Sequence, residues 1–531
     1  MLRSTLPLLF LMLSGAPGFH ASAAESLYDV ILRGGEIHDG TGAPSVVADL
    51  AFTGDRIAAM GDLRTADATT IIDARGLIIT PGFIDGHSHF GDREFLRAEL
   101  ASLEPLLAQG VTTAFINPDG WGLADLAEQR ALIIKARPAV NAAPMIAHKA
   151  VRVAVLGMSN RAPNPKELDA MRELVRVAFE RDGAFGLSTG LIYAPATFAQ
   201  TDELIALAKV ASQYGGFYHS HIRDEGDITV GFVTAIDELI RIARTAKLTG
   251  VVTHIKAAGP RVWGKTAEVI ARIEAARAEG LSIWADQYPY EAGATFLASV
   301  VLPGWAQADG LTAIRARLAD PATRARIRVE ALGYIEGRGG PGAYLISEFL
   351  PDPSLQGRRL DEIARSRGME PVDLAFDLIM RSEPRAVIFS MRDEDIVAFM
   401  RQPWTMTASD GFGDAHPRGH GTFPRKLKVF AMDRKIISLE RAIHSMTGQP
   451  AEVLGLSDRG VLRVGAFADV VAFDPKTLRD RATYEQPQLL AEGMVHVFVN
   501  GRATIANGKF TGERPGRVLM RNPQRPARNG P

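Results

Sequence analysis

The chain has 531 residues, 46% of them hydrophobic, which is enough for one large domain with a buried core and a smaller second domain. Its 60 basic and 61 acidic side chains give a formal charge of -1, so composition gives no electrostatic basis for binding nucleic acid or an anionic membrane surface. Cysteine is absent, which excludes disulfides, thiolate nucleophiles, thiolate metal ligands and a lipid anchor on cysteine.

The N-terminus has the pattern of a secretory signal peptide. Met1–Arg3 is a short positive start, and residues 6–13 form an apolar run too short to span a bilayer. Small residues at 21–23 then offer a cleavage site. We predict a signal peptide over residues 1–23 and a soluble product exported to the periplasm or the medium. A buried N-terminal helix is the alternative.

Both ends of the remaining chain predict β-structure. Short, alternating, β-branched runs separated by Gly and Asp turns are typical of strands. They lie at 28–34, 49–58, 69–73, 468–473 and 496–500. We predict that residues 24–79 and 449–520 form one small β-sandwich domain built from both termini, followed by a flexible tail over 521–531.

Residues 80–448 alternate short apolar strands with amphipathic helices, such as 202–214 and 266–280. Polar residues stand where the strands stop. The predicted strands end at 85–87, 116–117, 146–148, 187–189, 218–221, 253–254, 286–288 and 408–410. This α/β rhythm predicts a (β/α)8 TIM-like barrel, whose active site lies at the carboxyl ends of its strands. An open doubly wound sheet is disfavoured because no glycine-rich phosphate turn follows the first strand.

An insertion interrupts this rhythm at about residues 298–375. It contains Trp305, several Pro and Gly residues, and a helical segment near 311–318. We predict that it covers the barrel mouth, as a lid would.

A His-x-His pair is the strongest chemical signal. His87 and His89 follow an apolar strand, and residues two apart on a strand point to the same side, so both rings can face one metal ion. His221 and His254 end two further predicted strands. Asp410 ends another, and a carboxylate beside metal-activated water is a natural general base. A plain turn is the alternative for Asp410.

These residues stand in stretches that resemble the metal-dependent amidohydrolase superfamily, and within it the N-acyl-D-amino-acid deacylases (D-aminoacylases). The resemblance spans nearly the whole mature chain. The stretches are PGFIDGHSH from Pro81, GVTT from Gly110, GAFGLSTGLIYAP from Gly183, TDEL from Thr201, SHIRDE from Ser220, THIK from Thr253, DQYPY from Asp286, SDG from Ser409 and HPRGHGTFPR from His416.

The resemblance implies two metal positions, occupied by one or two zinc ions. His87 and His89 would hold one position, and His221 and His254 the other. Asp410 would also lie at the metal, take a proton from water and pass it to the leaving amine. In similar enzymes, the positions of Lys256, Tyr288 and Arg418 hold the substrate. A structural ion pair is the alternative for Lys256 and Arg418.

Asp119 marks a departure from the resemblance. D-aminoacylases carry a metal-bridging cysteine after the second strand, and here the same distance from Gly110 brings Asp119. We expect Asp119 to bridge or bind the metal. Because oxygen is a harder ligand than sulfur, Mn²⁺ or Co²⁺ then becomes possible beside Zn²⁺. A plain turn at Asp119 and a carbamylated Lys149 as the bridge are the alternatives.

A second departure concerns the substrate. Ala294 stands where similar enzymes often carry a hydroxyl, and the loop from Asp410 to His416 looks shorter. The expected reaction is hydrolysis of N-acyl-D-amino acids to a carboxylate and a free D-amino acid. An exported dipeptidase or D-peptidase of the same superfamily is one alternative, and a metal-free binding protein on an inactive barrel is another. The sequence leaves the acyl group and the oligomeric state open.

Overall fold

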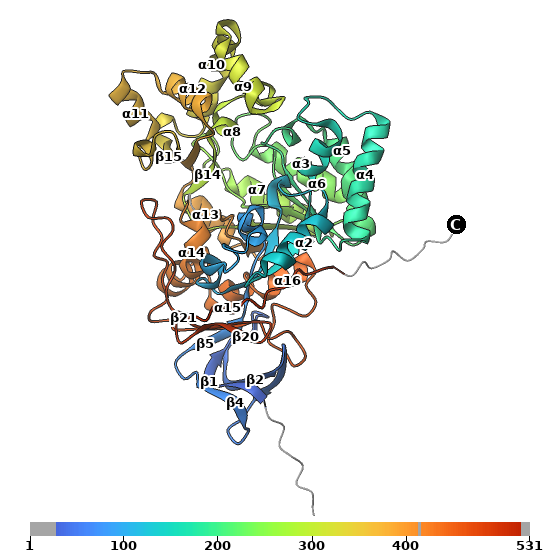
Figure 1. Ribbon diagram of the computed structural model, residues 1–531, viewed down its shortest axis with the longest axis vertical. Coiled ribbons are helices and arrows are strands. Elements are labelled where there is room, and N and C mark those ends of the chain that lie inside the picture. The colour runs from blue at the N-terminus through green and yellow to red at the C-terminus, as the bar shows by residue number, and fades with distance from the viewer. Residues whose placement is uncertain (1–27, 413–415, 522–531) are drawn as a thin grey trace, which may run out of the picture.

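The computed structural model describes residues 28–412 and 416–521, so the predicted signal peptide and all but the first residue of the predicted tail lie outside it. Figure 1 shows three layers along the longest axis. A sheet built from both ends of the chain lies at the bottom, parallel strands wrapped by helices fill the middle, and a lobe with helices α8 to α12 (residues 297–381) lies at the top.

The middle layer contains two all-parallel sheets, β6-β7-β8 and β17-β13-β12-β11-β10-β9. Each strand end predicted for the barrel lies within one of these strands or in the few residues that follow it. They are β6 (Phe83–Asp85), β7 (Val111–Ile116), β8 (Asn141–Pro144), β9 (Ile146–Ala147), β10 (Gly186–Gly190), β11 (Phe217–His221), β12 (Gly250–Val252), β13 (Ile283–Gln287) and β17 (Thr405–Thr407).

The two parallel sheets meet at both of their edges. Met145 alone separates β8 from β9. At the other edge, the Asp410 N–H donates to the His87 carbonyl over 2.9 Å, and Ser88 forms a parallel bridge with Gly411. The ladder is therefore interrupted at each junction, and the strand pairing by itself does not form one closed barrel. The coarser prediction, an α/β fold with parallel strands, is confirmed.

Helices pack around the parallel strands through apolar faces. The predicted helices at 202–214 and 266–280 are α5 (Thr201–Gln213) and α7 (Thr266–Ala278). In α6 (Phe232–Ala246), the buried side chains recur at helical spacing and join the same core as Tyr218 of β11 and Val252 of β12. Burial of this face fixes the orientation of the strand ends beneath it.

The terminal regions form one nine-stranded sheet, in which strands from both ends of the chain pair directly. Its elements are β1 (Tyr28–Ile37), β2 (Val46–Thr53), β3 (Arg56–Gly61), β4 (Ala68–Asp73), β5 (Ile78–Pro81), β18 (Val470–Phe473), β19 (Met494–Val499), β20 (Arg502–Ala506) and β21 (Lys509–Phe510). β18 runs antiparallel to β5. The predicted strand at 49–58 is two strands, because the chain turns at Gly54 with φ +59°.

The insertion predicted at about 298–375 contains one strand, β15 (Tyr344–Glu348), which pairs with β16 (Arg385–Phe389), and β14 (Ala292–Phe296) and β16 flank the insertion. The three strands form an antiparallel sheet. The helical segment predicted near 311–318 is α9 (Gly310–Ala319), which packs with α10 (Pro321–Gly337), α11 (Leu360–Arg367) and α12 (Pro371–Arg381) around a separate apolar core. The sheet carries the insertion back towards the strand ends, where it supplies cavity walls.

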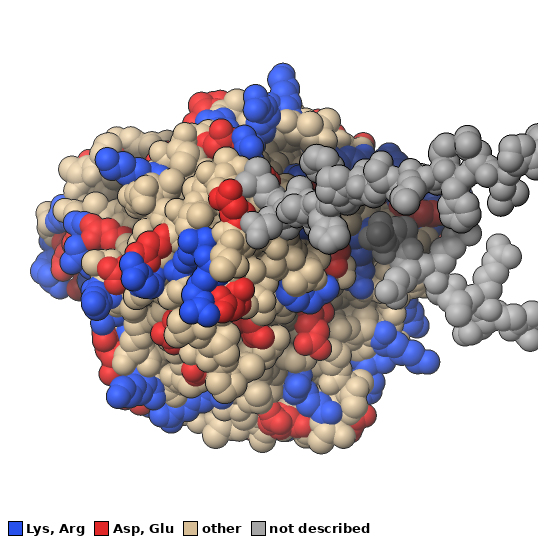
Figure 2. Space-filling view, turned by 90° about the horizontal axis from the view of Figure 1, so that it is seen from below, with Lys and Arg blue, Asp and Glu red and all other residues tan. Residues whose placement is uncertain are grey.

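Figure 2 shows the face seen from below, on which acidic and basic side chains are interspersed. Within residues 28–412 and 416–521, no helix combines the length and apolarity needed to cross a membrane.

Candidate metal centre and active site

Four histidines from three strands converge at the carboxyl ends of the parallel strands. His87 and His89 follow β6, His221 ends β11, and His254 follows β12. All four are at most 5% exposed. Ring centroids lie 5.3 Å apart for His87 and His89, 4.9 Å for His87 and His254, and 4.5 Å for His221 and His254. The structure thus brings the predicted ligand histidines together.

Asp119 lies between the four rings. It follows β7 in the short turn η3 (Pro118–Gly120), with φ +54° and 2% exposure. Its carboxylate oxygens lie 3.5 or 3.6 Å from a nitrogen of each ring. Although burial opposes ionisation, His87 and His254 hold the pKa of Asp119 well below its usual range. The carboxylate thus contacts all four rings. We name Asp119 and the four histidines the histidine–aspartate cluster.

The donor atoms of this cluster fit a metal ion. Two ligands bound tetrahedrally at about 2.1 Å stand roughly 3.4 Å apart, which is close to the separations between Asp119 and the rings. Both ring nitrogens of His87, both of His221, and Asp119 Oδ1 are buried without a hydrogen bond to any described residue. Because buried polar atoms are rarely left unpaired, these atoms indicate a ligand.

Asp410 faces the cluster from the end of β17. Its Oδ1 lies 3.4 Å from Nε2 of both His87 and His89, and its Oδ2 lies 2.9 Å from an Arg418 nitrogen. Burial opposes ionisation, but Arg418 and His254 hold the pKa of Asp410 well below its usual range. With φ +48°, the Asp410 backbone lies in the left-handed region, as in the plain turn that is the alternative for this residue, and its side chain is buried beside the cluster.

Asp85 connects the strand that carries His87 to the strand that carries Asp410. It accepts hydrogen bonds from the Ser409 N–H over 2.8 Å and the Ser409 hydroxyl over 2.5 Å, and the His87 N–H adds a third at 3.3 Å. Burial raises the pKa of Asp85 to about 6. Sequence reasoning did not single out this residue, although the quoted PGFIDGHSH stretch contains it.

Glu225 is a second residue that sequence reasoning missed. Its carboxylate lies 2.5 Å from Lys256 Nζ, 3.0 Å from His254 Nδ1 and 3.6 Å from His221 Nε2. Burial opposes ionisation, but His221, Lys256 and His254 lower the pKa of Glu225. The signal was available, since Glu225 ends the quoted SHIRDE stretch.

A second buried layer orients the His254 side of the cluster. His219 of β11 and Asp286 of β13 lie 3.1 Å apart, and the other Asp286 oxygen accepts from the His254 N–H over 2.6 Å. The His219 ring is 5.2 Å from that of His87. Such contacts fix the orientation of ligand rings.

Of the predicted substrate-binding residues, Lys256 and Arg418 are in ion pairs with Glu225 and Asp410. These contacts agree with the ion-pair alternative for both residues. The Arg418 guanidinium lies 4.7 Å from the Tyr288 ring centroid and donates to the Ala294 carbonyl over 3.2 Å. Burial raises the pKa of Tyr288, so its hydroxyl stays protonated.

Lys256, Tyr288 and Arg418 line one cavity, which we name the substrate cavity. Its other walls include Ile192, Val300, Arg338 and Ile388, and His221, His254 and Asp410 lie along it. The predicted alternative bridge, Lys149, points its ammonium at the Trp121 ring, 3.0 Å from the centroid.

Comparisons with known proteins agree with this geometry. The model of the Amidohydrolase family matches residues 70–505. The D-aminoacylase of Alcaligenes xylosoxydans xylosoxydans is 37% identical over 93% of this chain and 98% of its own length. A crystal structure of D-aminoacylase superposes with a TM-score of 0.80 at 36% identity, over 93% of this chain and 100% of that one.

A third similar protein was solved with ligands. N-acyl-D-glutamate deacylase from Bordetella bronchiseptica, in complex with zinc and a phosphonate that mimics the tetrahedral intermediate, has a TM-score of 0.80 at 33% identity. The alignment covers 93% of this chain and 100% of that one. The chain therefore belongs to the amidohydrolase family, in the group that contains the D-aminoacylases, and it is a hydrolase of amide bonds.

Proposed function

We propose that this protein hydrolyses N-acyl-D-amino acids to a carboxylate and a free D-amino acid, with zinc in the histidine–aspartate cluster. The observation that carries the proposal is the position of Asp119, within 3.6 Å of a nitrogen of all four histidines. The relatives named above supply the substrate class: one is a D-aminoacylase and one acts on N-acyl-D-glutamate.

Asp119 is the bridging ligand in this proposal, with His87 and His89 on one side and His221 and His254 on the other. The Lys149 ammonium stacks on Trp121, which favours Asp119 over a carbamylated lysine. A bound zinc ion would supply Lewis-acid polarisation of the amide carbonyl and lower the pKa of a water. The oxygen-rich bridge also admits Mn²⁺ or Co²⁺.

Asp410 is the proton carrier. Its pKa is held well below the usual range, so it is ionised at neutral pH, which is the form that can accept a proton from the attacking water. Its Oδ1 faces His87 and His89, while Arg418 holds Oδ2. The same carboxyl then returns the proton to the leaving amine.

Lys256, Arg418 and Tyr288 position the substrate carboxylate. Lys256 and Arg418 are 8% and 2% exposed, and each has a carboxylate partner at one edge of the substrate cavity. A bound carboxylate would share these cations with Glu225 and Asp410, which favours substrates that carry a negative charge next to the amide.

We make three further proposals, two about the fold and one about the location of the protein. We propose that the two parallel sheets act as one (β/α)8 barrel, supported by contacts at both junctions, and that the terminal sheet folds into a small β-sandwich. We also propose export after cleavage near residue 23, on the basis of the signal-like N-terminus.

The test is a matched panel of substrates with zinc-loaded mature protein. We expect turnover of N-acetyl-D-methionine, N-acetyl-D-leucine and N-acetyl-D-glutamate, with L-enantiomers at least about a hundredfold slower. Dipeptides in the same assay test the peptidase alternative. Preference for L-substrates or dipeptides would overturn the proposed substrate, and absence of both metal and turnover would support the binding-protein alternative.

A further inference from the structure

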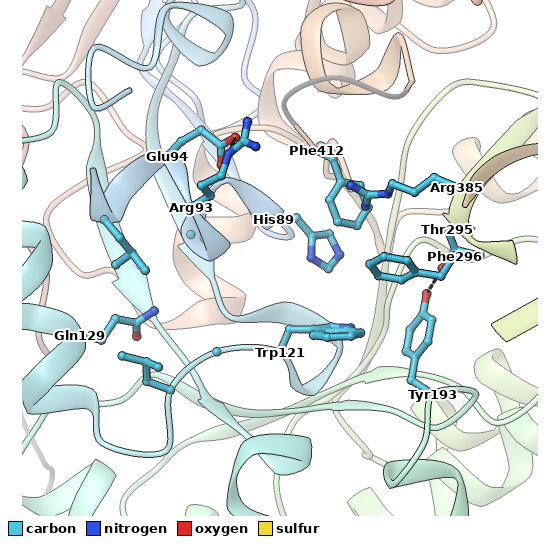
Figure 3. A pocket seen from close by; sticks show the side chains of 14 residues that line it. His89, Arg93, Glu94, Trp121, Gln129, Tyr193, Thr295, Phe296, Arg385 and Phe412 are labelled. Atoms are coloured by element: carbon cyan, nitrogen blue, oxygen red, sulfur yellow. Dashed lines mark hydrogen bonds and ion pairs between the residues drawn. The ribbon is translucent and has the colours of Figure 1, made fainter. Parts of the chain in front are cut away.

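A second cavity adjoins the substrate cavity on the far side of His89. Its volume is about 400 Å³, and its walls combine aromatic side chains from separate segments with the charged side chains of Arg93, Glu94 and Arg385. Figure 3 shows Trp121, Tyr193, Phe296 and Phe412 arranged around His89. We name it the aromatic cavity.

The aromatic cavity opens directly onto the proposed reaction centre. His89, Tyr193, Thr295 and Phe412 line both this cavity and the substrate cavity. Phe412 stacks on the His89 ring with centroids 4.2 Å apart. Tyr193 and Thr295 share a hydrogen bond of 3.1 Å, drawn as the dashed line in Figure 3. A substrate bound across these four residues would therefore reach into both cavities.

Both cavities carry cations, but Lys256 and Arg418 of the substrate cavity contact Glu225 and Asp410 beside the histidines, and these two cations set how an N-acyl amino acid lies across the cavities. Lys256, Arg338 and Arg418 line the substrate cavity, so the substrate carboxylate binds there. The amide then lies at the histidines, and the acyl chain leaves it in the opposite direction, towards the aromatic cavity. The amino-acid side chain branches from the α-carbon that also carries the carboxylate, and Ile192, Val300 and Ile388 of the substrate cavity offer it apolar contacts.

Size then selects the acyl group. A volume of about 400 Å³ lies in the range of cavities that enclose drug-sized ligands, far beyond the two carbons of acetyl. The aromatic rings approach one another without filling the space, with centroids 5.9 Å apart for Trp121 and Tyr193 and 6.0 Å for Trp121 and Phe296. An acetyl group would leave most of this apolar surface uncovered.

We propose that the aromatic cavity is an acyl-binding subsite, and that the preferred substrates carry a bulky apolar acyl group, from hexanoyl to phenylacetyl, rather than formyl or acetyl. This inference rests on the proposed function, because it assumes an N-acyl substrate. Burial of apolar acyl carbons against the rings supplies the selectivity.

The experiment compares acyl groups on one D-amino acid. We expect kcat/KM to rise about tenfold or more from N-acetyl- to N-hexanoyl- and N-phenylacetyl-D-methionine. Leu123→Trp fills the cavity from a loop, and Leu96→Trp fills it from another wall. Each variant should remove the rise, so that kcat/KM for the hexanoyl and phenylacetyl substrates falls to within about twofold of kcat/KM for the acetyl substrate in the same variant. The matched control, Leu350→Trp, changes a side chain that is 73% exposed and should keep the rise.

Direct binding separates failure of this inference from failure of the proposed function. Phenylacetate binding by calorimetry should be measurable in the wild-type protein and at least about tenfold weaker in Leu123→Trp. If no N-acyl amino acid is turned over, the proposed function fails, and loss of phenylacetate binding in Leu123→Trp still supports the subsite. Equal kcat/KM for acetyl and phenylacetyl, or phenylacetate binding that both cavity-filling variants retain, would overturn the inference.

Discussion

Two buried polar networks lie at opposite ends of the parallel strands, and they differ in how completely their atoms are partnered. The histidine–aspartate cluster leaves ring nitrogens of His87 and His221 and one oxygen of Asp119 without a hydrogen bond to any described residue. The second network, which we name the joint network, connects the terminal sheet to β8. Its members are Asn141, Arg459, Asp469 and Asn500.

The joint network is saturated. Arg459 pairs with Asp469 and donates to Asn500 over 2.8 Å, while the Asn500 amide donates to Asn141 over 2.8 Å. All four residues are at most 5% exposed, and none has an unpartnered side-chain atom among the described residues. Burial is thus the same in both networks, and the contrast indicates that one is built for a ligand and the other for stability.

The largest expected effect separates chemistry from stability in the first network. Asp410→Asn should lower kcat about a thousandfold, because the amide cannot take the proton from water. It should lower the melting temperature less than Asp469→Ala does, because the amide oxygen of the introduced asparagine can still accept a hydrogen bond from Arg418. Steady-state kinetics and thermal unfolding measure both. Asp480→Asn, which removes the charge opposite Arg425, is the control. An Asp410→Asn protein that keeps a tenth of the activity would refute the role.

Disruption of the joint network should lower stability and leave metal binding unchanged. Asp469→Ala leaves Arg459 buried without its partner and should cost about 3–5 kcal/mol of unfolding free energy in urea. Metal content per folded molecule should not change. The surface variant Asp458→Ala, with a side chain 47% exposed, should cost less than about 1 kcal/mol. Similar costs for the two variants would remove the contrast between the networks.

Metal removal should act on the histidine–aspartate cluster and not on the joint network. Chelation should lower the melting temperature of the wild-type protein by several degrees, because an ion that binds only the folded state stabilises it. Asp469→Ala should show the same drop, since the joint network holds no ligand, and Asp119→Ala should show a much smaller one. Scanning fluorimetry with and without dipicolinate measures this. An equal drop in Asp119→Ala would place the ion elsewhere.

The smallest expected effect comes from Lys426, a buried ammonium that begins η8 (Lys426–Asp433). Its Nζ donates to the Thr407 hydroxyl over 2.7 Å. Burial, and to a smaller extent the positive charge of nearby Arg441, holds the pKa of Lys426 well below its usual range. Between this lowered pKa and the pKa of about 10.4 in the unfolded chain, Lys426 is neutral in the folded protein and protonated in the unfolded chain. The free energy of unfolding therefore rises with pH in that window.

Lys426→Met removes this linkage. From about pH 7 to pH 9, the wild-type urea midpoint should rise more than that of Lys426→Met. Lys428→Met, at a side chain 33% exposed, should follow the wild-type protein. Parallel pH profiles for wild type and Lys426→Met would contradict the prediction.

Much of the site could be predicted because its residues follow strands. Residues two apart on a strand face the same side, so His87 and His89 could be paired from spacing alone, and each predicted strand end brought one more polar side chain to the same edge. Asp119 was found through the family resemblance, as the residue in place of a cysteine. Its left-handed backbone and its position among four rings depend on tertiary structure.

The two site residues that were not predicted, Asp85 and Glu225, contact predicted site residues or their neighbours. Asp85 contacts Ser409 across more than three hundred positions of the chain, and Glu225 meets His254 and Lys256 from a loop. Neither carboxylate lies at a predicted ligand position, and no local spacing reveals such pairs. The antiparallel sheet of the insertion was missed for a related reason, because β14 and β16 are separated by the helices of the lobe.

The central claim is that Asp119 joins the four histidines into one metal centre. The most direct measurement is the metal content of purified wild type, Asp119→Ala and the Asp458→Ala control by mass spectrometry. We predict at least about one zinc per wild-type and Asp458→Ala chain, and a loss of half or more in Asp119→Ala. Full metal content in a folded Asp119→Ala protein would contradict the claim.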